Sequence, residues 1–121
     1  RRLCGTPLEL APDRAVVELT PGADMAADDR GLVHGGFVFG LADYAAMLAV
    51  NHPNVVLAGA SVEFKAPVVV GERVRATARI TGREGKRATV EVEVTRGDDL
   101  VFTGTFHTAT PPGHVLDRRP R

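Results

Sequence analysis

Apolar and polar residues alternate with a period of two along most of the second half of the chain, which is typical of half-buried β-strands. Between residues 72 and 83, for example, Val74 and Ala76 alternate with Arg73 and Arg75. The full set of expected strands covers residues 15–20, 55–66, 72–83, 87–95 and 100–110. Turn-forming segments at residues 82–86 and 97–99 predict that the last three strands form antiparallel hairpins.

The first of these hairpins has a register that keeps its apolar faces together. We expect Ala76 to lie opposite Val92, and this register also places Arg75 across from Glu93. Opposite charges at such cross-strand positions stabilise a sheet.

Residues 35–51 follow a different pattern, because apolar side chains occupy nearly every position rather than every second one. Leu, Ala and Met dominate, which favours a helix over a strand, and Pro53 stops this helix. A helix that is apolar on almost all sides must be covered, so we expect a curved sheet to wrap around it. One strand, one central helix and four antiparallel strands make an α+β order, and this architecture is the hotdog fold.

The 121 residues suffice for one hydrophobic core, so we expect a single domain with residues 11–110 as its core and residues 111–121 as a C-terminal tail. Fifteen Lys and Arg balance fifteen Asp and Glu. This balance leaves no global field that would attract nucleic acid or an anionic membrane. No uncharged apolar run reaches the roughly 18 to 20 residues of a membrane-spanning helix. We therefore expect neither nucleic acid nor a membrane as a partner.

Cys4 is the single cysteine, so an intrachain disulfide and a cysteine-based metal site are excluded. No signal peptide is recognisable in a chain that begins with Arg, and the cytoplasm is the expected location. His52, His107 and His114 lack the i, i+4 spacing of a metal site, and no glycine-rich nucleotide motif occurs. We expect no metal and no cofactor.

The sequence Val33-His34-Gly35-Gly36 enters the predicted helix. Its two glycines let a ligand approach the free N–H groups of the first helical turn, where the potential is positive. Such a site can polarise a carbonyl group or hold a phosphate. A tight turn that needs small residues for packing explains the same glycines.

Asp43 is the only ionisable side chain, apart from the Tyr44 phenol, between Gly35 and Asn51. An unpaired carboxylate buried in an apolar helix costs several kcal/mol or takes up a proton. Such an aspartate therefore has either a chemical role or a hydrogen-bonding partner, for which Tyr44 and a neighbouring subunit are both candidates.

Gly35 and Asp43 are eight residues apart, which is about 12 Å along a helix axis. A reacting carbonyl carbon must lie about 3 Å from both the oxyanion donors and the base or nucleophile. One chain cannot satisfy both distances. A catalytic use of this pair therefore predicts a homodimer with antiparallel helices and two shared active sites.

The segment LVHGGFVFGLADYAAMLAVN resembles the helix motif HGG-x-x-x-x-L-A-D-x-A of the phenylacetic-acid-degradation (PaaI-like) branch of hotdog thioesterases. Further along, VEFKAPVVVGERVRATARI resembles the second and third strands of that family at lower specificity. The resemblance implies an acyl-CoA thioesterase that hydrolyses a small, medium-chain or aromatic acyl-CoA to free acid and CoA.

In that family the aspartate activates water or attacks the thioester, while the N–H of the first motif glycine holds the carbonyl oxygen. By resemblance these roles belong to Asp43 and Gly35. Relatives often carry Asn six residues before the motif histidine, where this chain has Asp28 followed by Asp29, and Thr at the position of Tyr44. The first difference weakens the case for a second polar catalytic group, and the second suggests a different acyl pocket.

Other residues are candidates for contacts with an acyl-CoA. They are His34, Gly36, Phe37, Tyr44 and Met47 around the motif, and Lys65, Arg83, Lys86 and Arg87 near strand ends for the CoA phosphates. Each group has an alternative role. The main alternative for His34 is a hydrogen bond within the loop. Aromatic and Met side chains on such a helix also pack in cores, and exposed cations often do no more than keep a surface hydrated. We further expect the dimers to pair into a homotetramer.

Two other functions compete with the thioesterase. A hotdog module that binds acyl-CoA as a sensor, without catalysis, is the first of them. The second is a hotdog enoyl-CoA hydratase, for which Asp29 and His34 have the required spacing, although the helix motif argues for hydrolysis.

Overall fold

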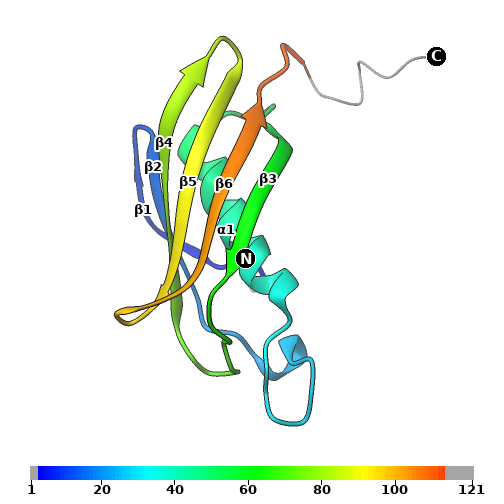
Figure 1. The fold of residues 1–121 in the computed structure, drawn as a ribbon. Helices are drawn as coiled ribbons and strands as arrows, with labels where there is room; N and C mark the ends of the chain where they lie inside the picture. The colour runs from blue at the N-terminus through cyan, green and yellow to red at the C-terminus, as the bar shows by residue number, and fades with distance from the viewer. Residues whose placement is uncertain (1–2, 114–121) are drawn as a thin grey trace, which may run out of the picture.

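The computed structural model describes residues 3–113, in which one antiparallel sheet curves around one long helix (Figure 1). Most of the predicted tail, including His114, lies outside the described residues. The strands are β1 (Thr6–Ala11), β2 (Arg14–Leu19), β3 (Val56–Phe64), β4 (Val74–Glu84), β5 (Arg87–Arg96) and β6 (Asp99–Ala109). The helices are a short 3-10 turn, η1 (Ala23–Met25), and α1 (Gly35–Val50). The sheet order β1-β2-β4-β5-β6-β3 confirms the predicted hotdog architecture.

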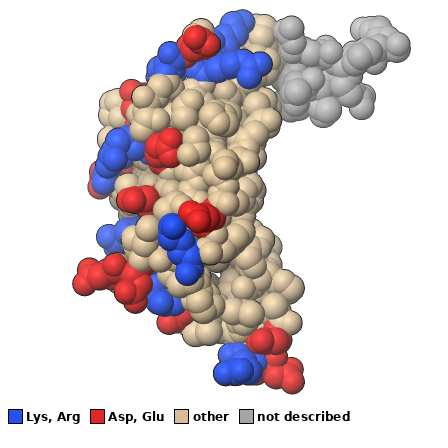
Figure 2. Space-filling model, viewed as in Figure 1, with Lys and Arg blue, Asp and Glu red and all other residues tan. Residues whose placement is uncertain are grey.

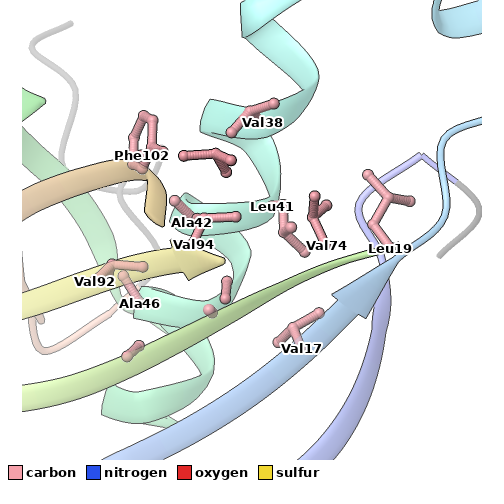
Figure 3. Close-up of a cluster of buried hydrophobic side chains, with 14 of the residues drawn as sticks. Val17, Leu19, Val38, Leu41, Ala42, Ala46, Val74, Val92, Val94 and Phe102 are labelled. Atoms are coloured by element: carbon pink, nitrogen blue, oxygen red, sulfur yellow. The ribbon is translucent and has the colours of Figure 1, made fainter. Parts of the chain in front are cut away.

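The core lies between the inner face of α1 and the concave face of the sheet (Figure 3). Alanines on this face of α1, including Ala42 and Ala46, let the helix approach the sheet closely and are fully buried. Large side chains fill the space from the sheet side, and Phe102 and Phe106 of β6 are also fully buried. The opposite face of α1 remains partly exposed, so this chain alone does not cover the apolar helix.

Helix α1 ends at Val50, one residue before the predicted limit at Asn51, which caps the helix. Asn51 adopts the left-handed conformation at φ 54°, and its N–H donates to the Met47 carbonyl oxygen at 2.9 Å. This is a common way to satisfy the last carbonyl groups of a helix, and Asn tolerates it better than most residues.

Strand β1 was not predicted, and it extends the sheet to residues before the expected core boundary at residue 11. Every residue of β1 is exposed on this edge of the sheet. The strand was missed because it is only six residues long and contains Pro7, a residue that sheets tolerate mainly in edge strands.

The predicted register of the β4–β5 hairpin is wrong by two residues. Arg75 lies opposite Thr95, and Glu93 lies opposite Thr77. The ion-pair partner of Arg75 is instead Glu18 on β2, at 3.1 Å. A shift of two keeps the same faces inward, so the apolar pattern alone does not distinguish the two registers.

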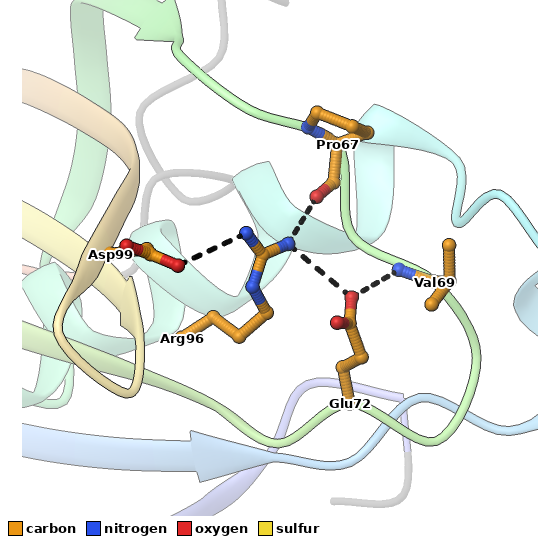
Figure 4. A network of polar contacts seen from close by, with 5 residues as sticks. All are labelled: Pro67, Val69, Glu72, Arg96 and Asp99. Carbon is orange, nitrogen blue, oxygen red and sulfur yellow. Dashed lines mark hydrogen bonds and ion pairs between the residues drawn. The ribbon is translucent and has the colours of Figure 1, made fainter.

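Arg96 holds the loop that joins β3 to β4 (Figure 4). Its Nη1 donates to the Pro67 carbonyl oxygen at 2.6 Å and to Glu72 Oε1 at 3.4 Å, and its Nη2 lies 3.5 Å from Asp99 Oδ2. Glu72 Oε1 also accepts a hydrogen bond from the Val69 N–H at 2.8 Å. One guanidinium group thus ties residues 67–72 to the β5–β6 turn.

Within residues 3–113, no helix combines the length and the hydropathy that crossing a membrane requires.

Candidate functional site

The N-terminus of α1 presents free backbone donors to solvent. His34 caps the helix without a side-chain hydrogen bond, and its backbone N–H donates to the Met25 carbonyl oxygen at 3.0 Å. Within the described residues, the N–H groups of Gly35 and Gly36 have no acceptor, and both glycines are exposed. Two unpaired N–H groups at the positive end of a helix can donate hydrogen bonds to a carbonyl oxygen or to an anionic group.

The loop before the helix is fixed by the loop that Arg96 holds. The Val33 N–H donates to the Val68 carbonyl oxygen, and the Val70 N–H donates to the Gly31 carbonyl oxygen, both at 2.8 Å. Two short antiparallel segments thereby set the position at which the chain enters α1.

Asp28 organises the same loop from within. Its Oδ1 accepts hydrogen bonds from the Arg30 and Leu32 N–H groups, each at 3.0 Å. This carboxylate is therefore committed to backbone donors, which gives a structural role to the position where PaaI-like relatives often carry Asn.

An apolar cavity of about 260 Å³ opens beside Gly35. Its lining residues are Val33, Gly35, Val38, Phe64, Lys65, Ala66, Pro67 and Val68. Phe64 stands over the backbone of Gly35, so a Cβ atom at Gly35 would lie 3.1 Å from Phe64 Cε1. Gly35, which carries one of the two free N–H groups, is part of this largely apolar lining, whereas Gly36 is not.

Asp43 lies on the partly exposed face of α1. By helical spacing it shares that face with Gly36, Gly40 and Met47. Its Oδ1 is buried and has no hydrogen-bond partner, and this burial raises the pKa of the Asp43 carboxyl above its ordinary value. A carboxylate that is short of solvent and unpaired is a stronger base than an exposed one.

Gly35 and Asp43 belong to the same helix of 16 residues, so one chain does not bring them together. The candidates Phe37, Tyr44 and Met47 are partly buried and pack against the core cluster. None of these three side chains lines the cavity beside Gly35. The neighbouring Phe39 ring packs on the Phe106 ring, with the ring centroids 5.5 Å apart.

The four cations expected at the CoA phosphates fall into two places. Arg83, Lys86 and Arg87 line a cavity of about 410 Å³ together with Val50 and His52, at the C-terminal end of α1. Figure 2 shows Lys and Arg atoms gathered at this end of the molecule, where β4 and β5 join. Lys65 instead lines the cavity beside Gly35, at the other end of the helix.

Among residues 3–113, no group of three or more His, Cys, Asp or Glu side chains is arranged to hold a metal ion.

Two kinds of comparison define the family. Residues 30–103 match the family model of the thioesterase superfamily. The fold superimposes on uncharacterized protein PH1136 from Pyrococcus horikoshii with a TM-score of 0.95, at 50% identity, covering 97% of this chain and 90% of the other. The chain therefore belongs to the thioesterase superfamily.

Within that superfamily it is a PaaI-like hotdog protein, as its helix motif predicted. A mutant of the phenylacetic acid degradation protein PaaI from Thermus thermophilus is 34% identical, with a TM-score of 0.83, and the match covers 90% of this chain and 95% of the other.

Curated relatives carry different names. Methylthioribose-1-phosphate isomerase of Aquifex aeolicus is 53% identical over 89% of this chain and 24% of its own length. The transcription factor FapR of Shouchella clausii is 34% identical over 78% of this chain and 49% of its own length. The chain thus spans only about a quarter to a half of these relatives.

Sequence reasoning missed Phe64 and Arg96 as parts of this region. Phe64 ends β3, a strand rich in apolar residues, and nothing in that sequence indicates that the strand ends against the N-terminus of α1. Arg96 is the last residue of the alternating strand β5, and its contacts with residues 67 and 72 depend on the loop geometry. The available signal was weak: an aromatic residue before Lys65-Ala66-Pro67, where the strand must end.

Proposed function

We propose that this protein hydrolyses an acyl-CoA thioester, with Gly35 polarising the carbonyl group and Asp43 of a partner chain acting as base or nucleophile. The observation that carries the proposal is the buried, unpaired Oδ1 of Asp43 on a helix whose N-terminus offers unpaired N–H groups. A buried charge without a partner is unfavourable, so its presence argues for a chemical role.

In the general-base form of the reaction, Asp43 removes a proton from water as the water oxygen attacks the thioester carbon. The carbonyl oxygen becomes an oxyanion that accepts hydrogen bonds from the Gly35 and Gly36 N–H groups. The tetrahedral intermediate then breaks its carbon–sulfur bond. The CoA thiolate takes the proton back from Asp43, which leaves a free acid and CoA.

A second, antiparallel copy of α1 would bring the partner's carboxylate to Gly35. The partly exposed helix face supports this arrangement, because a Cβ atom at Gly36 or Gly40 would meet nothing within 4 Å in the isolated chain. The fold itself does not require glycine there. A neighbouring helix or a substrate that approaches the backbone closely would explain the two glycines.

In such a dimer the CoA phosphates would meet Arg83, Lys86 and Arg87 of the subunit that supplies Asp43. These cations surround the C-terminal end of α1, and Val50 lies seven residues beyond Asp43, or about 10 Å along the axis. All three are exposed, and only Arg83 has an ion-pair partner within residues 3–113, Asp13 at 2.8 Å. Phe37, Tyr44, Met47 and His34 would contact the substrate or the partner helix near the shared site.

Release of free thiol from aliphatic and aromatic acyl-CoAs tests the activity directly. Asp43→Asn removes the base and is expected to lower kcat by about 100-fold or more, with a smaller change in KM. Hydrolysis by Asp43→Asn at the native rate would refute the role of Asp43.

Mixing two damaged chains tests the shared site. Gly35→Ala and Asp43→Asn are each expected to be weakly active, whereas a mixed dimer holds one site with both intact residues. After denaturation and refolding together, activity should recover to about a quarter of the native value, because half of the random dimers are mixed. A mixture that stays at the mean of the two variants would exclude a site built from two chains.

A sensor of acyl-CoA is the second candidate, favoured by the similarity to the transcription factor FapR. The sensor would bind acyl-CoA tightly and release no thiol. Calorimetric binding measured beside the thiol assay separates the two functions, since an enzyme turns the ligand over and a sensor does not.

A further inference from the structure

We infer that the cavity beside Gly35 holds the acyl group of the substrate, that this group is uncharged and apolar, and that the Phe64 ring limits its size. The inference rests on the proposed thioesterase function, because it takes the N–H groups at Gly35 as the carbonyl site. It adds a specificity-determining residue, Phe64, that the helix motif does not contain.

The cavity is continuous with the carbonyl site. Gly35 lines it and also carries one of the unpaired N–H groups. A carbonyl oxygen bound at Gly35 would place its acyl substituent beside these apolar walls. Three of those walls, Val33, Val38 and Val68, are buried core residues and therefore form a rigid surface.

Phe64 is the wall that determines the size of the cavity, since it alone among the apolar lining residues is a large exposed side chain. Its relative exposure is 55%, the highest of the large apolar residues in the described chain. The ring is nevertheless fixed in place, because it meets the buried Phe102 ring edge to face at 5.1 Å. The Phe64 ring is thus positioned by Phe102 on one side and exposed on the other, so its position sets the space available to a ligand.

The charge around the cavity argues against an acyl group with its own carboxylate. Lys65 is the only ionisable residue in the lining, and its Nζ already pairs with Glu63 Oε1 at 3.0 Å. A carboxylate in the cavity would share the Lys65 ammonium with Glu63 and would be repelled by the Glu63 carboxylate close by. Aliphatic or aromatic acyl groups meet no such repulsion.

Thiol release across a series of straight-chain acyl-CoAs, with phenylacetyl-CoA and succinyl-CoA added, tests the inference. Phe64→Ala and Phe64→Leu enlarge the cavity and should move the preferred chain to greater length. The kcat/KM ratio between chains that differ by one methylene should change by about tenfold at the new limit. Phe64→Trp should move the limit to shorter chains, and succinyl-CoA should remain a poor substrate throughout.

Two further variants make the result specific. Leu8→Ala removes a comparably exposed apolar side chain from β1, at the opposite edge of the sheet, and should leave the chain-length profile unchanged. Met47→Ala opens the Asp43 face of the helix instead. If Met47→Ala shifts the profile and the Phe64 variants do not, the acyl group lies along the helix and the inference is wrong.

Equal loss on every substrate in the Phe64 variants would also overturn it, since a merely structural role lowers all rates together. Binding of the same series to Asp43→Asn keeps the inference separate from the proposed catalysis. If the native protein hydrolyses nothing, yet affinity depends on chain length and on Phe64, the acyl cavity stands and the thioesterase proposal falls. If affinity depends neither on chain length nor on Phe64, the cavity is not the acyl site.

Discussion

The Phe64 ring lies directly over Gly35, so that a Cβ atom at Gly35 would come within 3.1 Å of Phe64 Cε1 and 3.3 Å of its Cζ. Contacts this short require one of the two groups to give by a few tenths of an ångström. Gly35→Ala should therefore displace either the ring or the first turn of α1. We expect activity to fall by about 100-fold or more, the loss typical of a misplaced oxyanion donor.

Gly36→Ala is the matched control for this prediction. A Cβ atom at Gly36 meets nothing within 4 Å in the isolated chain, so its thermal unfolding should stay close to that of the native protein at low protein concentration. Equal destabilisation by the two substitutions would mean that Phe64 does not constrain Gly35.

Activity should depend on pH through Asp43. Burial raises the pKa of this carboxyl, and only its ionised form accepts a proton or attacks a carbon. The kcat/KM value should therefore fall as the pH is lowered through the raised pKa, and the fall should begin at a higher pH than an exposed aspartate would give. Asp43→Asn should lose this acidic limb while keeping its low residual rate.

The same carboxylate should make the folded protein less stable at neutral pH. Because the folded-state pKa lies above the unfolded one, the folded protein binds the proton more tightly, and stability decreases as the pH rises through this range. Asp43→Asn should raise the melting temperature at neutral pH, and the gain should shrink in acid. Asp98→Asn, in the exposed β5–β6 turn, should change neither. A lower melting temperature for Asp43→Asn at neutral pH would show that the carboxylate is paired in the assembled protein.

The sequence was sufficient for the helix, for five of the six strands and for the motif that begins α1. These features depend on local periodicity and on turn residues, which are visible in one chain. The Arg75 register could not be predicted, since two registers two residues apart bury the same face, and the distinguishing contact with Glu18 comes from a distant strand. The role of Phe64 could not be predicted for a similar reason, because it depends on where β3 ends relative to α1, which is distant in the sequence.

The partly exposed face of α1 should tolerate a large side chain in the monomer but not in a dimer. Gly40→Leu adds a side chain where the isolated chain offers open space, so the fold should persist. At a two-fold helix interface the insertion occurs on both chains and overpacks each by about 1–3 kcal/mol. Sedimentation should show a shift to monomer, with activity lost in parallel. Gly82→Leu, on β4 near the hairpin turn, serves as the control and should leave assembly unchanged. An active monomer would remove the shared site.

Arg96 should act as a positioning residue for the site, because the loop it holds both walls the cavity and fixes the segment before α1. Its Nη1 donates to the Pro67 carbonyl oxygen at 2.6 Å and to Glu72 Oε1, which also accepts a hydrogen bond from the Val69 N–H. Arg96→Ala removes charge-assisted hydrogen bonds worth about 1.5–3 kcal/mol, and kcat/KM should drop by about tenfold or more, mainly through KM.

Arg96→Lys should recover little of this loss, since one ammonium group cannot replace the planar fork that reaches residues 67, 72 and 99 together. Hydrogen exchange gives a readout independent of turnover: amides of residues 68–72 and 31–33 should exchange faster in Arg96→Ala. Arg79→Ala, an exposed cation on β4, should alter neither exchange nor KM. Faster exchange at residues 68–72 without any change at 31–33 would mean that the two loops are not coupled, and that Arg96 stabilises the fold without positioning the helix entrance.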